Sequence, residues 1–292
     1  MNHLLDFENI NISKLEQLLN QIINIDQDQL NTINSFALLK FDESSTRTRL
    51  SFSAAAQKLG IKVLETTNNI SALSKGESLM HEIETYKGLG INVLVIRTKE
   101  NNIEDYKSLN DLSVISAGFG TTSHPTQALL DVATLLKFNL LNKEIPITYI
   151  GDLKHSRVFN SGRELLNKLG YKVGVFTSDN LMPENLRGLH KFSDWNEIFE
   201  NSNSIELLRV QKERIHNLQD FDFKTYTKKY QLTSKILKNA KKDFVVLHPM
   251  PINIGIEISE DASKDYRFIY NEQLKLTVPT RIVSYLYALG IQ

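Results

Sequence analysis

The sequence predicts an α/β protein of two domains, each a parallel sheet covered by helices on both faces. Apolar runs of strand length alternate with amphipathic runs of helix length almost throughout the chain. The strand-like runs are continuously apolar, as in parallel strands that are buried on both faces. The alternation passes through two successive series, and 292 residues are enough for two domains of ordinary size.

The first series occupies residues 1–125. Ser13 and Glu16 have the spacing of a capping box, which predicts the start of the first helix. Further helices are predicted over 44–60 and 78–90, the former ending at Gly60 in the C′ position. Apolar runs predict strands over 36–41, 62–67, 91–98 and 113–118.

The second series begins after a helix predicted over 126–138, which we expect to bridge the two domains. Strands are predicted over 146–152, 171–179, 204–210 and 242–249, and helices over 158–170, 194–201 and 280–289. We therefore expect one domain at 1–125, completed by a C-terminal helix at 278–292, and a second domain at 126–277.

Composition limits the classes of function. Lys plus Arg and Asp plus Glu number 34 each, and this balance does not favour a nucleic-acid binder, although a local basic pocket stays possible. The absence of cysteine excludes disulfides, Cys-ligated zinc, Fe–S clusters and a thiol nucleophile. The start lacks the pattern of a signal peptide, and no run of about 20 apolar residues could span a membrane. We expect a soluble cytoplasmic protein.

The segment from Ser45 to Arg49 follows a predicted strand and opens a helix. A helix N-terminus offers backbone N–H groups and partial positive charge, which suit a phosphate. Hydroxyl groups add donors, and Arg47 can bind phosphate oxygens with two parallel hydrogen bonds. The alternative is an ordinary capped helix with solvated arginines.

Other polar residues lie where ligands bind in open α/β sheets, beyond the carboxyl ends of strands. They are Lys75, Arg97, His124, Arg157, Arg209 and His248. Each has a structural alternative: a solvated lysine, an arginine extending out of the core, a structural histidine, or Arg209 paired with Glu213 four residues later. The G-x-x-x-x-G-K-[ST] and G-x-G-x-x-G phosphate motifs and metal-ligand spacings are missing. The residues indicate a transferase for small anions, one of them a phosphate.

The segment FDESSTRTRLSF resembles the carbamoyl-phosphate signature F-x-x-x-S-T-R-T-R of the aspartate and ornithine carbamoyltransferases. KGES, VIRT, HPTQALLD, GDLKHSR, LLRVQKER and HPMP are similar to the later motifs of this family, in order and spacing, over nearly the whole chain. RVQKER and HPMP resemble the aspartate branch, since ornithine enzymes have an H-C-L-P turn and an S-M-G signature. The resemblance implies carbamoyl transfer from carbamoyl phosphate to L-aspartate, in pyrimidine biosynthesis, with no metal or organic cofactor.

The resemblance also implies a role for each matching residue. Those expected to bind the phosphate are Ser45, Thr46, Arg47 and Thr48. Those expected to hydrogen-bond the carbonyl oxygen are Thr48, Arg97 and His124, and those expected to bind the carbamoyl amide are Gln127 and the carbonyls of Met250 and Pro251. Those expected to hold aspartate are Lys75, Arg157, Arg209 and Gln211. Ser71 and Lys75 would reach a neighbouring subunit's site, which implies a homotrimer. Binding of regulatory or dihydroorotase-like chains stays open.

Two departures from the family pattern leave alternatives open. Ile254 stands where many members have arginine, and LKLTVPT (274–280) lies between Gln273 and Arg281 where the family often has an N-G pair. One alternative is a degenerate, non-catalytic member that binds a ligand or partner proteins. Another is a carbamoyltransferase for a different amino acid.

Overall fold

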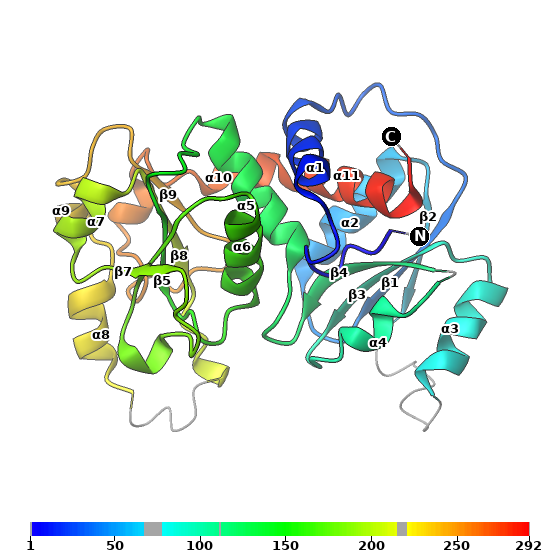
Figure 1. The fold of residues 1–292 in the computed structure, drawn as a ribbon, viewed down its shortest axis with the longest axis horizontal. Helices are drawn as coiled ribbons and strands as arrows, with labels where there is room; N and C mark the ends of the chain where they lie inside the picture. Colours follow the sequence, from blue (N-terminus) through cyan, green and yellow to red (C-terminus); the bar gives the residue numbers. More distant parts are fainter. Residues whose placement is uncertain (1, 67–77, 111, 215–220, 292) are drawn as a thin grey trace. The chain divides into compact units, whose positions relative to one another are not determined.

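The computed structural model describes residues 2–66, 78–110, 112–214 and 221–291. The chain divides into two compact units, Met1–Ala133 with Lys275–Gln292, and Thr134–Leu274. The division falls within helix α5 (Pro125–Lys137), and the chain re-enters the first unit before helix α11 (Thr277–Leu289) (Figure 1). Each unit contains one parallel sheet flanked by helices, so the predicted fold class is confirmed.

The first unit contains a four-stranded sheet in the order β2-β1-β3-β4, with all neighbours parallel. Its strands are β1 (Phe36–Phe41), β2 (Lys62–Thr66), β3 (Val93–Thr98) and β4 (Ser113–Phe119). The register places Phe41 beside Arg97, and Arg97 beside Gly118. The ends of β1, β3 and β4 are therefore level, and the segments that follow them start from one edge.

Helices cover both faces of this sheet. They are α1 (Ile12–Asn24), α2 (Thr46–Lys58), α3 (Leu79–Gly88), α4 (Glu104–Lys107) and α11. Ile83 and Tyr86 of α3 and Tyr106 of α4 form one core cluster with Leu94 and Ile96 of β3. On the other face, α11 contacts α1, α2, β3 and β4. Because successive strand residues point to opposite faces, β3 is buried from both sides.

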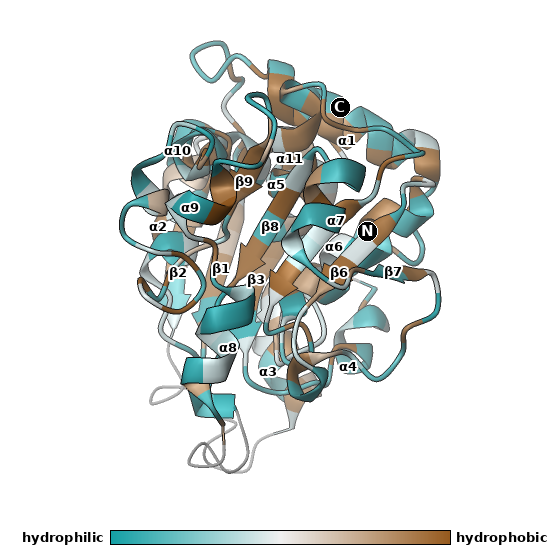
Figure 2. Cartoon of the chain, turned by 90° about the vertical axis from the view of Figure 1, so that its left-hand side faces the viewer, coloured by the Kyte–Doolittle hydropathy of each residue, from teal (hydrophilic) through white to brown (hydrophobic). Residues whose placement is uncertain are grey.

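The second unit contains a five-stranded parallel sheet in the order β7-β6-β5-β8-β9. Its strands are β5 (Ile147–Gly151), β6 (Val173–Phe176), β7 (Leu189–Lys191), β8 (Ser204–Leu208) and β9 (Val245–Leu247). Its helices include α6 (Arg157–Lys168), α7 (Trp195–Asn201), α8 (Phe223–Tyr230), α9 (Ser234–Leu237) and α10 (Tyr270–Lys275), with 3-10 turns η3 (Asp179–Leu181), η4 (Lys212–Arg214) and η6 (Ala262–Lys264). In Figure 2 most of the ribbon of α8 has the colour of hydrophilic residues.

An aromatic core fills one side of this second sheet. The rings of Phe176 and Trp195 meet edge to face at 5.5 Å, within a buried cluster that also receives side chains from α8 and α9. On β5, Tyr149 packs against Phe159 of α6, with ring centroids 5.3 Å apart. Such aromatic pairs stabilise a fold by about 0.5–1.5 kcal/mol beyond the area that they bury.

The predicted strands are all present, several of them shorter than expected. The predicted end of α2 is confirmed, since Gly60 follows the helix with a φ of +70°. The predicted capping box is wrong. Helix α1 begins at Ile12, and the side chain of Asn11 caps it by accepting from Lys14 N at 2.8 Å. Asn is as good an N-cap as Ser, and it stands two residues earlier.

Candidate active site

Helix α2 begins directly after the carboxyl edge of the first sheet. Ser45 is its N-cap residue with extended backbone, and its side chain makes no capping hydrogen bond. Arg47 is exposed and Thr48 is buried, whereas Arg49 pairs with Glu65 at 3.6 Å. The first backbone N–H groups of a helix have no partner within the helix. The start of α2 therefore suits a bound anion. The alternative of an ordinary capped helix is less favoured, because the Ser45 side chain does not cap it.

Arg97 is the last residue but one of β3, at the same edge. Its Nη1 donates to the carbonyl oxygen of Ala117 at 3.1 Å, and its Nε lies 3.2 Å from Oε2 of Glu43. The side chain is only 16% exposed, so the guanidinium does not extend into solvent as the structural alternative would require. An anion at this edge would compete with Glu43 for the guanidinium.

His124 and Gln127 lie at the start of α5, soon after β4. His124 is buried, and its Nδ1 lies 3.5 Å from the hydroxyl of Thr126. Gln127 Nε2 donates to Oδ1 of Asp131 at 2.9 Å. Pro125 is the first helical residue, a position where its missing N–H costs nothing. The α2 start, Arg97 and His124, which the sequence analysis singled out, thus lie at or after the level ends of β1, β3 and β4.

In the second unit, Arg157 and Arg209 follow neighbouring strands. Gly151 at the end of β5 pairs with Leu208 at the end of β8, so both arginines start from one edge of this sheet. Arg157 is the first residue of α6 and is 9% exposed. The hydroxyl of Ser156 caps this helix by accepting from Phe159 N at 3.2 Å, which fixes the start of α6 and with it the backbone of Arg157.

Arg209 contacts Glu213 through both terminal nitrogens, with Nη1 3.2 Å from Oε2. The pair proposed as a structural alternative is therefore present, although Arg209 lies in the loop before η4 and not in an α-helix. The hydrogen bond from Arg209 lowers the pKa of the Glu213 carboxyl. Nearby, Gln211 donates from Nε2 to the carbonyl of His155 at 2.9 Å.

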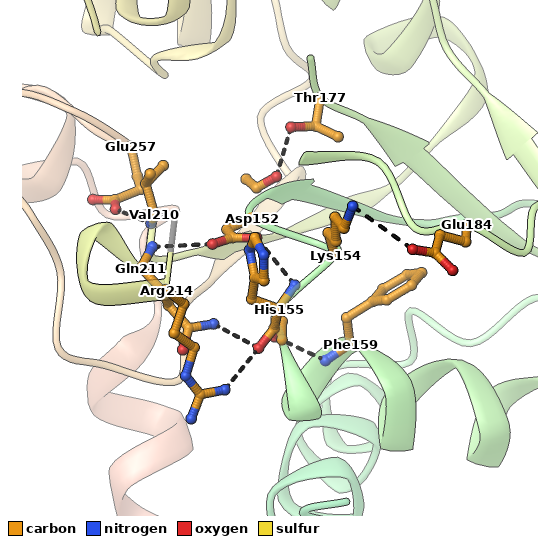
Figure 3. A network of polar contacts seen from close by, with 12 residues as sticks. Asp152, Lys154, His155, Phe159, Thr177, Glu184, Val210, Gln211, Arg214 and Glu257 are labelled. Atoms are coloured by element: carbon orange, nitrogen blue, oxygen red, sulfur yellow. Dashed lines mark hydrogen bonds and ion pairs between the residues drawn. The ribbon is translucent and has the colours of Figure 1, made fainter. Parts of the chain in front are cut away.

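Two buried carboxylates hold the backbone between Arg209 and Gln211. Glu257 accepts from Val210 N at 2.6 Å, and Asp152 accepts from Gln211 N at 3.1 Å (Figure 3). Glu257 also accepts from Asn253 N at 2.8 Å. Burial raises the pKa of the Glu257 carboxyl, and the backbone hydrogen bonds from Val210 and Asn253 oppose this rise. The segment that carries the predicted acceptor-binding residues is thus fixed from two sides.

Met250 and Pro251 follow β9 in a turn with a cis peptide bond between them. Met250 has a φ of 59°, and its N–H donates to Nδ1 of His248 at 2.8 Å. The N–H of His248 in turn donates to Oε1 of Gln273 at 2.9 Å. Gln273 therefore supports the turn whose carbonyls were predicted to bind the carbamoyl group.

The other predictions concern Ser71, Lys75, Ile254 and segment 274–280. Ser71 and Lys75 lie outside the described residues. Ile254, which replaces the family's arginine, is 46% exposed in a turn closed by the hydrogen bond from Gly255 N to the carbonyl of Ile258. The altered segment 274–280 spans the end of α10 and the start of α11, and Gln273 and Arg281 on either side of it both make buried contacts.

Sequence reasoning missed the carboxylates of the site. They are Glu43, Asp131, Asp152 and Glu257. Asp131 could have been found from the sequence, because it stands four residues after Gln127 on one predicted helix, the spacing at which two side chains can contact each other. Glu257 lies 47 residues from Val210 in sequence, and nothing local connects them.

Among the residues that the structure describes, no three His, Asp or Glu side chains are grouped as a metal site. Nor does any helix in the described ranges have the length and hydropathy to cross a membrane.

Comparisons with known proteins agree over nearly the whole chain. The family model "Aspartate/ornithine carbamoyltransferase, carbamoyl-P binding domain" matches residues 2–137, and "Aspartate/ornithine carbamoyltransferase, Asp/Orn binding domain" matches residues 143–282. The aspartate carbamoyltransferase catalytic subunit of Aquifex aeolicus is 33% identical over 94% of this chain and 94% of its own length. That of Coxiella burnetii is 33% identical over 96% of this chain and 94% of its own.

Among solved structures, aspartate transcarbamoylase from Trypanosoma cruzi in complex with carbamoyl phosphate and aspartate has a TM-score of 0.85 at 26% identity, covering 99% of this chain and 96% of that chain. The same enzyme in complex with N-(phosphonacetyl)-L-aspartic acid has a TM-score of 0.84 at 27% identity, covering 99% of this chain and 95% of that chain. The chain belongs to the aspartate/ornithine carbamoyltransferase family.

Proposed function

We propose that this protein is an aspartate carbamoyltransferase, which transfers the carbamoyl group of carbamoyl phosphate to L-aspartate and releases phosphate. The observation that carries the proposal is the pair of cationic sheet edges. One gathers the α2 start, Arg97 and His124, and the other gathers Arg157 and Arg209. The first suits an acyl phosphate, and the second suits an acceptor with two carboxylates. The names of the relatives, and the ligands named for the solved structures, support this assignment.

The chemistry follows from the groups at the first edge. The amine of aspartate attacks the carbonyl carbon of carbamoyl phosphate, and a tetrahedral oxyanion forms. Thr48, Arg97 and His124 are assigned to donate hydrogen bonds to that oxygen. Removing one such donor in other enzymes costs about 3–4 kcal/mol of transition-state stabilisation. The C–O bond to phosphate then breaks, and the aspartate nitrogen gives up one proton to the leaving phosphate. Arg47 and the N–H groups of α2, with the hydroxyls of Ser45 and Thr46, stabilise that phosphate.

The second edge accounts for the choice of acceptor. Arg157 and Arg209 present two cations, which match the two carboxylates of aspartate, and Gln211 adds an amide. Ornithine carries an ammonium in place of the second carboxylate. Juxtaposed like charges cost several kcal/mol, so this edge would reject ornithine. The carbonyls of Met250 and Pro251 are assigned to the carbamoyl amino group.

The assembly belongs to the same proposal. Ser71 and Lys75 are assigned to a neighbouring subunit's site, with Lys75 binding aspartate there, so the active form would be a homotrimer. Regulatory or dihydroorotase-like chains could bind such a trimer, and pyrimidine biosynthesis is the pathway that the reaction implies.

A steady-state assay of carbamoyl aspartate formation tests the proposal, with ornithine as the control acceptor. We expect turnover with aspartate and at least a hundredfold lower kcat/KM with ornithine. A like-charge contact that costs several kcal/mol would lower kcat/KM by at least roughly this factor. Binding of carbamoyl phosphate without turnover of any amino acid would favour the non-catalytic alternative that Ile254 and segment 274–280 left open. Turnover of a different amino acid alone would overturn the choice of acceptor.

A further inference from the structure

Arg281 is a buried cation to which the proposed chemistry gives no role. It lies on α11, is 2% exposed, and its guanidinium carbon lies 4.9 Å from the ring centroid of Phe52. Burial lowers the pKa of Arg281 to about 10, and the attraction of Asp131 opposes this change. The group therefore remains charged at neutral pH. Burying a charge is costly unless it is paired and hydrogen-bonded, so the contacts of this guanidinium are informative.

Those contacts reach both helices that carry the assigned carbamoyl-phosphate residues. Arg281 Nη1 donates to the carbonyl of Thr126 at 2.8 Å, and Nε donates to the hydroxyl of Ser51 at 3.3 Å. Ser51 donates in turn to the carbonyl of Thr48 at 2.8 Å. Thr126 stands between His124 and Gln127 in the chain. One cation thus fixes the first turns of α2 and α5 relative to each other.

Asp131 holds the side chain of Gln127 on the same helix, α5. The carboxylate is 1% exposed and accepts from Gln127 Nε2 at 2.9 Å. An ionised carboxylate can only accept hydrogen bonds, so the amide nitrogen of Gln127 must face Asp131. The amide oxygen of Gln127 is then turned away from Asp131.

We infer that Asp131 and Arg281 are positioning residues that make the first edge selective for the amino group of a carbamoyl phosphate. Asp131 fixes the Gln127 amide so that its oxygen accepts from the –NH2 of the substrate, and Arg281 holds the first turn of α5, which carries Gln127, through the carbonyl of Thr126. An acyl phosphate with a methyl group there, such as acetyl phosphate, offers no donor to this oxygen. The inference rests on the proposed function, because it takes carbamoyl phosphate as the ligand.

The test compares the dissociation constants of carbamoyl phosphate and acetyl phosphate in Asp131→Asn. The neutral amide that this substitution introduces can donate or accept, so the Gln127 amide is no longer held in one orientation. We expect about tenfold weaker binding of carbamoyl phosphate, the value of one hydrogen bond, and acetyl phosphate binding within about twofold of the parent protein. Asp105→Asn, on an exposed turn of α4, is the matched control and should change neither constant.

The outcomes separate the inference from the proposed function. If the parent protein binds neither ligand, both fail. If the parent binds carbamoyl phosphate and Asp131→Asn leaves its preference over acetyl phosphate unchanged, only the inference fails. Equal weakening of both ligands would mean that Asp131 merely supports the fold, and would also overturn it.

Further variants keep the test decisive if Asp131→Asn does not fold, as judged by circular dichroism and thermal melting. Gln127→Met removes the amide oxygen and should abolish the preference for carbamoyl over acetyl phosphate. Arg281→Lys keeps the positive charge but loses the planar fork that reaches Thr126 and Ser51. It should lower the melting temperature and reduce the preference for carbamoyl over acetyl phosphate, because the first turn of α5 is held less firmly. An unchanged preference in Gln127→Met or in a folded Arg281→Lys would contradict the inference.

Discussion

Two of the arginines assigned to anionic groups lie against glutamates. Arg97 contacts Glu43, and Arg209 contacts Glu213. The second pair is the more exposed, with 28% and 56% of the side chains accessible. Exposed ion pairs typically contribute about 0–1 kcal/mol, so a substrate carboxylate could displace Glu213 at little cost. These glutamates hold the guanidinium groups in place, and a substrate anion can still bind to the guanidinium groups.

Arg209→Ala separates the two roles of this arginine. If Arg209 binds a substrate carboxylate, the KM for aspartate should rise roughly 10- to 100-fold, the range for a hydrogen bond to a charged group. Loss of the exposed pair with Glu213 should lower the free energy of unfolding by less than about 1 kcal/mol. Kinetics and urea denaturation measure both quantities. Glu213→Gln is the control for the pair alone. An unchanged KM in Arg209→Ala would remove the main reason for naming aspartate.

Substitutions of His124 and of Arg47 should affect different steps of the reaction. His124→Ala should lower kcat about 10²- to 10³-fold while sparing most affinity for carbamoyl phosphate, because its hydrogen bond strengthens as the oxyanion forms. Arg47→Ala should instead abolish phosphate binding. Calorimetric titration with carbamoyl phosphate and steady-state kinetics on both variants distinguish the two effects. Equal loss of binding would count against the role given to His124.

Helix starts are the elements that place the cationic groups. Ser156 caps α6, whose first residue is Arg157, and Asn11 caps α1, far in sequence from any assigned residue. Ser156→Ala and Asn11→Ala should each lower stability by about 1 kcal/mol. Only Ser156→Ala should also raise the KM for aspartate, because α6 would fray at Arg157. Thermal melting and kinetics of the matched pair test this, and a shift in KM for both variants would point to a general loss of folded protein.

Most elements could be predicted because the buried strands are apolar without interruption. β3 and β4 are almost wholly buried, and such runs cannot be confused with surface segments. Short peripheral elements were missed for the opposite reason. The residues of β7 are largely exposed, and α8 buries only Tyr226 and Tyr230. The cap of α1 was misplaced because Asn11 and Ser13 are both good N-cap residues, and packing decides between them.

The cations assigned to the site could also be singled out from the sequence, since each lies at the end of a predicted strand or after one. Their partners could not. Asp152 and Glu257 are fully or almost fully buried, and each holds one backbone amide of the segment between Arg209 and Gln211. That pairing depends on which strands become neighbours in the folded sheet. A single sequence contains no local signal for it.

At the scale of the whole molecule, the proposed trimer predicts that two inactive variants restore activity when their chains are mixed. Lys75→Ala chains and Arg47→Ala chains should each be inactive. Mixed under conditions of subunit exchange, they should regain some activity, because some sites would receive both intact residues. Size-exclusion chromatography with light scattering measures the assembly, and assays of the mixture measure the recovery. A mixture as inactive as its parents, with exchange verified by differently tagged chains, would contradict a shared site.

The order of the units along the chain has a consequence for biosynthesis. Residues 134–274 form the second unit without interruption, whereas the first unit needs Lys275–Gln292 in addition to its N-terminal part. A ribosome therefore completes the second unit first, and domains generally fold as units. Until α11 emerges, the nascent chain lacks the guanidinium of Arg281 that joins α2 to α5. A released chain of residues 1–274 should thus protect its second unit from protease while its first unit is still cleaved, and such a chain would hold the arginines assigned to the acceptor without forming the site assigned to the donor.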